Sequence, residues 1–179
     1  MPDTKRKVLV AYATWAGSTA GVAERVAGVL NRNGFAAEAL RAKDVRDVSP
    51  HDAVVLGAAV RAGKLHADAL RFTRRNAADL GSKPFAAFVV CLAAKESDEK
   101  ARATAAAYLE PVRAQVKPLS EGIFAGAYDP AKVNSVLRLV MEKMIKAPPG
   151  DFRKWDEVEA WAASLVPLFG KGQQAEARM

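Results

Sequence analysis

Residues 14–19 combine the side chains and backbone that can hold a phosphate group. Hydroxyls lie at both ends of the segment, a glycine lies between them, and a helix is expected to start directly behind it. Backbone N–H groups, hydroxyls and the positive end of a helix dipole can then face one anion. The alternative is that Ser18 or Thr19 only caps the helix. The segment consists of Thr14, Trp15, Ala16, Gly17, Ser18 and Thr19.

The same segment does not match the common nucleotide loops. It lacks the lysine of GxxxxGK(S/T), which argues against a nucleoside triphosphate, and the glycines of GxGxxG, which argues against the pyrophosphate of NAD. A terminal monophosphate fits better, because hydroxyls can surround it without a countercharge. We therefore expect a monophosphate site here.

Charge and composition narrow the class of protein. The chain has 27 Lys and Arg against 20 Asp and Glu, a net charge of +7, which suggests an anionic partner. The basic residues are spread along the chain without an aromatic platform, so we do not expect nucleic acid to be that partner. The single cysteine, Cys91, excludes an intramolecular disulfide. With one cysteine and only two histidines, no metal site is expected. No apolar run approaches the roughly 20 residues that span a bilayer, and the expected location is the cytoplasm.

The elements that must position this loop follow from alternating apolar runs and helical patterns. A length of 179 residues corresponds to about one domain. Five strands separated by helices predict a doubly wound α/β fold, a parallel sheet with helices on both faces. Ligands of such sheets bind at the carboxyl ends of the strands. The expected strands are residues 8–14, 35–41, 53–57, 84–92 and 122–128, and the expected helices are 18–33, 66–80, 97–116 and a last one from about 154.

Three segments resemble a known family. The pattern (S/T)-x-x-G-x-T at residues 14–19 resembles the FMN phosphate loop of flavodoxins. Residues 57–66 (GAAVRAGKLH) resemble a loop of the flavodoxin-like, menaquinone-dependent protoporphyrinogen oxidases, and residues 150–155 (GDFRKW) are similar to their C-terminal segment. The resemblance covers residues from about 8 to 168. It implies the flavodoxin strand order 2-1-3-4-5, FMN as cofactor, a flavodoxin-like domain at residues 1–170 and a polar tail at 171–179.

The resemblance also implies which residues bind the cofactor. With the phosphate at residues 14–19, the flavin ring must lie across the loops after the third and fourth strands. Ala62 stands where the resembling enzymes often carry tyrosine, which leaves one flavin face open or covered by another group. Trp15 either supplies an aromatic wall or packs the loop against the protein. The residues expected beside the ring are Ala59, Val60, Arg61, Ala62, Gly63, Leu92, Ala93 and Ala94.

Other side chains near these loops have two interpretations each. Arg61 and Lys64 could pair with a reduced flavin or with substrate carboxylates, or they could belong to an ordinary solvated loop. We expect His66 to have a structural role at a helix start rather than to donate protons. Cys91 is expected to be a small buried hydrophobic residue.

The chain carries an insertion at about residues 129–150, between the fifth strand and the last helix. Its apolar residues follow helical spacing, and Lys132, Arg138, Lys143 and Lys146 lie off that stripe. Such a helix could pack on the core, rest on an anionic membrane surface through residues 130–147, or close over a hydrophobic substrate. The resembling oxidases have their insertion at this place and use a membrane quinone. The stripe consists of Val133, Val136, Leu137, Val140, Met141, Met144 and Ile145.

The sequence therefore predicts an FMN-dependent oxidoreductase, similar to quinone-dependent protoporphyrinogen oxidase, that passes electrons from a reduced substrate through FMN to a quinone. It could be peripheral on the inner face of the cell membrane. No side chain stands out as a catalytic acid or base. The alternative is a flavodoxin that carries electrons between proteins, and the basic charge argues against it because such carriers are usually acidic.

Overall fold

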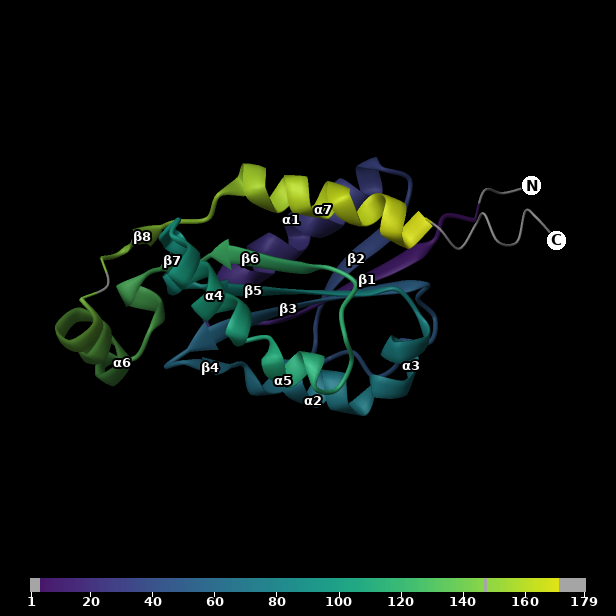
Figure 1. The fold of residues 1–179 in the computed structure, drawn as a ribbon. Coiled ribbons are helices and arrows are strands. Elements are labelled where there is room, and N and C mark those ends of the chain that lie inside the picture. Colours follow the sequence, from purple (N-terminus) through teal and green to yellow (C-terminus); the bar gives the residue numbers. More distant parts are fainter. Residues whose placement is uncertain (1–3, 147, 171–179) are drawn as a thin grey trace.

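The central sheet of the computed structural model has five parallel strands in the order β2-β1-β3-β5-β6. The structure describes residues 4–146 and 148–170, without the side chains of Met144 and Ile145. The short strand β4 lies off this path, so counting only the five parallel strands gives the order 2-1-3-4-5. The predicted fold class and strand order are therefore confirmed (Figure 1). These strands are β1 (Lys7–Ala13), β2 (Ala36–Arg41), β3 (Ala53–Arg61), β5 (Phe85–Cys91) and β6 (Glu121–Ala125).

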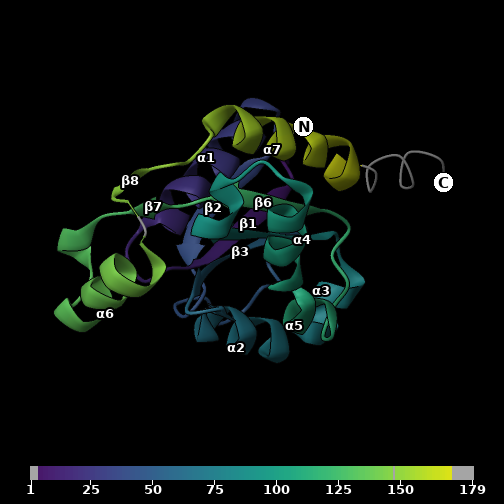
Figure 2. The same ribbon diagram turned by 60° about the vertical axis from the view of Figure 1, so that its left-hand side comes forward.

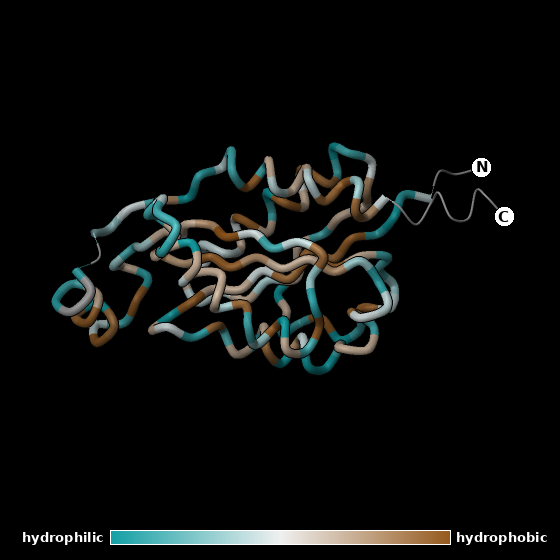
Figure 3. Tube along the Cα trace, in the orientation of Figure 1, coloured by the Kyte–Doolittle hydropathy of each residue, from teal (hydrophilic) through white to brown (hydrophobic). Residues whose placement is uncertain are grey.

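The near-continuous apolar runs became the central strands because both faces of the sheet are covered. Every residue of β5 is buried, and so are the first seven residues of β3. Strand β2, at one edge, contains only half-buried and exposed residues. Hydrophobic residues accordingly concentrate along the middle of the sheet (Figure 3).

Two layers of helices sandwich the sheet (Figure 1). On one face, α1 (Ser18–Arg32) packs beside α7 (Trp155–Gly170), which begins one residue after the predicted position. The opposite face is covered by α2 (Ala67–Arg75), α3 (Ala77–Ser82) and α5 (Glu110–Arg113). The remaining long helix, α4 (Glu99–Ala107), contacts β5 and β6.

Three aromatic rings fix α7 to the sheet. Phe88 on β5, Phe124 on β6 and Trp161 on α7 have ring centres 5.6–5.8 Å apart. The Trp161 Nε1 also donates a hydrogen bond to Ser120 Oγ at 3.0 Å. Gly57 makes room for this cluster, because a Cβ atom there would lie 2.1 Å from the Phe88 ring.

Two predicted helices are each broken into two. The helix expected at residues 66–80 divides at Asn76, whose Nδ2 donates to the Phe72 carbonyl at 2.9 Å. The helix expected at residues 97–116 ends as α4 at Ala107, because Pro111 has no N–H for the next helical hydrogen bond. The buried face of the first of these helices continues across the break, since Ala69, Phe72, Thr73, Asn76 and Leu80 are all buried.

Strand β3 is four residues longer than expected. It continues to Arg61 and turns back through a hairpin into the short β4 (Lys64–Leu65). Ala62 and Gly63 form the turn with φ angles of 49° and 72°. Positive φ at both central residues is typical of a type I′ turn, which matches the twist of a hairpin. The prediction of a loop directly after Gly57 was therefore wrong.

The insertion begins and ends in two short paired strands, with short helical segments between them. Strands β7 (Ala127–Tyr128) and β8 (Gly150–Asp151) pair antiparallel and join its two ends. Between them lie a 3-10 turn (Pro130–Lys132), α6 (Ser135–Val140) and a π-helical turn (Met141–Ile145). Within the range 130–147 in which an amphipathic helix was expected, α6 begins only at Ser135, because the Asn134 side chain caps it by accepting a hydrogen bond from the Leu137 N–H.

Figures 1 and 2 both place α6 beyond the sheet, at the end where β6 runs into β7. Residue 147 and the predicted tail at 171–179 lie outside the described residues. Within the described part of the chain, no helix combines the length and the hydrophobicity needed to cross a membrane.

Candidate functional site

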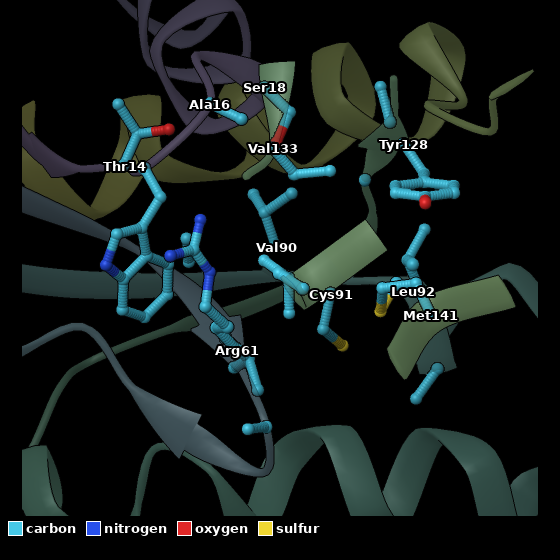
Figure 4. A pocket seen from close by; sticks show the side chains of 18 of the residues that line it. Thr14, Ala16, Ser18, Arg61, Val90, Cys91, Leu92, Tyr128, Val133 and Met141 are labelled. Atoms are coloured by element: carbon cyan, nitrogen blue, oxygen red, sulfur yellow. The ribbon is translucent and has the colours of Figure 1, made fainter. Parts of the chain in front are cut away.

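A cavity of about 270 Å³ lies at the carboxyl ends of β1, β3, β5 and β6 (Figure 4). It is where a doubly wound sheet is expected to bind its ligand. Of the residues predicted to hold the cofactor, all except Gly17, Thr19 and Ala94 line this cavity. The structure thus brings together the first loop, the β3–β4 hairpin and the turn after β5.

The loop after β1, residues 14–19 and here called the first loop, leads into a helix without a side-chain cap. Gly17 precedes α1 with a φ of 92°, in the left-handed region that favours glycine, and donates its N–H to Thr14 Oγ1 at 2.9 Å. No side chain caps α1, so the interpretation of Ser18 or Thr19 as a simple helix cap is wrong. The first N–H groups of α1 therefore remain available to an anion.

Thr19 shows that this loop suits a phosphate. Its side chain is fully buried, and its Oγ1 has no hydrogen-bond partner among the described residues. A buried hydroxyl without a partner costs about 1–3 kcal/mol. Ser18, one residue earlier, lines the cavity. Two hydroxyls and an uncapped helix end are the donor set that a terminal phosphate requires.

The Trp15 ring contacts the side chains of Arg61 and His66. The Arg61 guanidinium lies 4.6 Å from the centre of its ring, a cation–π contact, and the His66 ring centre lies 4.2 Å away. The indole is 39% exposed and lines the cavity, so it both packs the loop and forms a wall. Burial lowers the pKa of Arg61, which remains a cation at neutral pH.

His66 has the structural role that was predicted. Its Nδ1 accepts a hydrogen bond from the Asp68 N–H at 3.1 Å, which caps α2. Burial lowers the pKa of His66, so the neutral ring with its hydrogen on Nε2 is favoured at neutral pH. Lys64 is exposed and, like His66, does not line the cavity.

The turn after β5 closes another side of the cavity. Residues Leu92–Lys95 form a 3-10 turn, so Leu92 and Ala93 reach the cavity while Ala94 does not. Cys91 is 5% exposed, as expected of a small buried hydrophobic residue, and also borders the cavity. Burial raises the pKa of its thiol, which therefore stays protonated at neutral pH.

The insertion supplies three lining residues that belong to the predicted apolar stripe but were not predicted to bind the cofactor. Val133, Leu137 and Met141, spaced by four, border the cavity, whereas Val136 is 72% exposed. The predicted apolar stripe is thus divided: some of its residues face the cavity and others face solvent. The i, i+4 spacing of the cavity-facing residues was the signal that could have distinguished the two groups. The other unforeseen lining residues are Val90, Tyr108, Gly126, Ala127 and Tyr128.

Arg153 contacts the backbone at the start of α1. Its guanidinium is held by both carboxylate oxygens of Asp151, at 2.6 and 2.9 Å, and lies 4.7 Å from the ring centre of Trp155. Its Nη1 lies 3.4 Å from the Ser18 carbonyl. A Cβ atom at Gly21 would lie 2.6 Å from that same nitrogen, so the glycine makes room for the arginine. Nothing in the spacing of these residues indicated this contact.

Relatives and solved structures show a consistent similarity. The chain is 26% identical over 178 residues to protoporphyrinogen IX dehydrogenase (quinone) of Escherichia coli K12, which covers 92% of this chain and 97% of that protein. An archaeal flavodoxin structure has a TM-score of 0.56 at 13% identity, covering 92% of this chain and 99% of that one. Flavodoxin of Megasphaera elsdenii has a TM-score of 0.54 at 18% identity, covering 88% and 98%. These structures share the fold of the chain.

The family is shown by the sequence as a whole. A sequence model of the flavodoxin domain matches residues 9–154, which include the first loop, the hairpin and the insertion. The carboxyl-end cavity and the uncapped first helix are what such a domain requires for its flavin. The chain therefore belongs to the flavodoxin domain family, and FMN is its cofactor.

Proposed function

We propose that this protein is an FMN-dependent oxidoreductase that takes electrons from a reduced small molecule of the protoporphyrinogen type and passes them to a quinone. When bound, FMN supplies the redox chemistry, because its ring can accept and release electrons. The side chains of the protein hold the flavin, exclude water from it and select the substrate.

The proposed placement of FMN follows from the donors and small residues of the site. The phosphate binds at residues 14–19, with Ser18, Thr19 and the first N–H groups of α1 as donors. On one side of the ring would lie residues 59–63, at the end of β3 and in its hairpin turn. On the other side would lie residues 92–94, in the turn after β5. Ala62 and Gly63 present little side chain at the hairpin, so the ring can approach the backbone closely.

The observation that carries the proposal is the apolar wall of the insertion. Val133, Leu137 and Met141 close the flavin cavity on the side away from the sheet. A protein that only carries electrons must bring the edge of its flavin to the surface of a protein partner. A wall of this kind instead creates a water-poor space for a small apolar substrate. The net charge of +7 points the same way.

The similarity to the Escherichia coli protein supports the substrate class. That protein is named for protoporphyrinogen IX and a quinone, and the match spans 97% of its length. At 26% identity, the match supports the type of reaction, and an activity measurement identifies the substrate.

Anaerobic turnover tests the proposal. FMN-loaded protein is mixed with protoporphyrinogen IX and a soluble menaquinone analogue, and quinone reduction and porphyrin fluorescence are followed together. The proposal predicts quinone reduction that depends on both the protein and the porphyrinogen. Flavin that exchanges electrons with a redox protein but gives no porphyrinogen-dependent quinone reduction would establish the carrier function instead.

We also propose that the outer face of α6 meets an anionic membrane, where a lipid-soluble quinone resides. Val136 and Leu139 on this face are 72% and 51% exposed, and Arg138 and Lys143 lie beside them on exposed positions. Apolar side chains flanked by cations suit the interface of an anionic bilayer.

Pelleting with vesicles tests this second proposal. We expect V136S/L139S to bind less to vesicles that contain anionic lipid, with no change on neutral vesicles. L119S is the matched control, because Leu119 is 59% exposed but precedes β6 on another part of the surface. Equal binding of V136S/L139S and the unchanged protein would refute the membrane contact.

A further inference from the structure

A second, basic pocket of about 640 Å³ shares Trp15 as a lining residue with the cavity at the carboxyl ends of the strands, here called the flavin cavity. Three cationic side chains line it, from two distant parts of the chain. Arg41 and Lys43 belong to the carboxyl end of β2 and the turn after it, and Lys132 belongs to the insertion. The insertion therefore helps to build both pockets.

The positive charge of the basic pocket is not neutralised within the protein. Among the described residues, Arg41, Lys43 and Lys132 form no ion pair. The one carboxylate that lines the pocket, Asp68, is ion-paired with Arg71. Three cations converging on a concave surface produce a local positive potential that attracts an anion.

The two pockets share a wall. Thr14, Trp15 and Ala16 line both of them. Lys132 lines the basic pocket, while the next residue, Val133, lines the flavin cavity. A ligand whose apolar body lies under the insertion can therefore extend a charged group past Trp15 to the cations.

We propose that Arg41, Lys43 and Lys132 bind the carboxylate groups of the substrate, while its apolar part lies against the flavin. This inference rests on the proposed function and adds to it the residues that would bind the carboxylate side arms of such a substrate. According to this inference, the basic pocket is what distinguishes acidic substrates from their uncharged analogues. The cations are exposed, so each contributes a modest affinity and the sum depends on ionic strength.

The experiment compares two probes and two variants on FMN-loaded protein. The probes are mesoporphyrin IX, which carries two carboxylates and does not react with the flavin, and its dimethyl ester, which is uncharged. The variants are R41Q/K43Q and, as control, R46Q, because Arg46 is exposed a few residues further along the same loop and lines neither pocket. Affinities are measured by fluorescence at low and moderate salt.

We expect R41Q/K43Q to bind the diacid roughly three- to tenfold more weakly at low salt, with the ester unaffected. R46Q should leave both affinities within a factor of two, because Arg46 lines neither pocket. Equal weakening by R46Q, equal loss for diacid and ester, or no change in R41Q/K43Q would overturn the proposal. Inorganic phosphate is titrated alongside, and phosphate binding without diacid binding would assign the pocket to free phosphate and also overturn it.

The visible spectrum of each sample keeps this test separate from that of the proposed function. Loss of flavin absorbance would show that the cofactor site has failed, whereas the basic pocket is judged only on samples that retain full FMN. Diacid binding without any quinone turnover would support the pocket while refuting the proposed reaction.

Discussion

The sheet and the insertion are built in opposite ways. Val8, Leu9 and Val10 of β1 have no exposed surface, whereas neither the 3-10 turn nor α6 of the insertion contains a buried residue. The sheet carries the stability and holds the loops that are expected to bind FMN. The insertion adds little to the core but closes the flavin cavity and contributes Lys132 to the basic pocket. A change in one region should therefore alter folding, and a change in the other should alter binding.

Truncation of a core ring should have the largest effect. F88A removes the centre of the aromatic cluster on α7 and β6, and we expect a loss of about 3–5 kcal/mol in the free energy of unfolding. L139A, at a position 51% exposed on the insertion, should change it by less than about 0.5 kcal/mol. Urea unfolding of the two variants checks this contrast, and similar losses for both would contradict it.

A polar change in the cavity wall should alter activity more than stability. L137S replaces an apolar residue that borders the flavin cavity, and the lost apolar contact of about 1–2 kcal/mol should lower kcat/KM roughly 5- to 30-fold. V136S changes a 72% exposed neighbour and should leave kcat/KM with a soluble quinone unchanged. If both serine variants lose activity equally, the wall has no specific role.

The smallest expected effect is the pH dependence contributed by His66. Burial lowers its pKa below the ordinary value of 6.5, so the unfolded chain binds the proton more readily. Its contribution to stability is thus fully present above pH 6.5 and declines as the pH falls toward the lower, folded pKa. H66N keeps a cap at α2 without a titrating ring, and its stability should fall less over that range. Parallel pH profiles of the two proteins would contradict the assignment.

The parts that the sequence predicted are those governed by local patterns. The apolar runs of β1, β3 and β5 indicated strands covered on both faces, and the hydroxyls and glycine of residues 14–19 indicated an anion loop at the end of the first strand. These features depend on residues that are close in the sequence. Alternation of strands and helices then fixed the end of the sheet at which the site lies.

The parts that were missed depend on contacts between distant residues. The hairpin at Ala62 and Gly63 requires an alanine at positive φ, which propensity alone does not suggest. The direction of each residue on the insertion depends on how α6 is placed over the cavity, so Val136 could not be separated from Leu137 beforehand. The contact of Arg153 with the Ser18 carbonyl joins residues 135 positions apart.

The central claim is that the first loop holds the phosphate of FMN, and Thr19 offers the most direct test. T19V removes a buried hydroxyl that has no partner among the described residues, so the apoprotein should be no less stable. T73V is the matched control, because Thr73 is equally buried but donates to the Ala69 carbonyl at 2.9 Å, away from the cavity.

The measurement is the affinity of the apoprotein for FMN and for riboflavin, which lacks the phosphate. The account predicts that T19V weakens FMN binding roughly 10- to 100-fold, as expected for a hydrogen bond to a charged group, and leaves riboflavin binding unchanged. T73V should leave both affinities unchanged. Unaltered FMN binding by T19V, or an equal loss for FMN and riboflavin, would contradict the account.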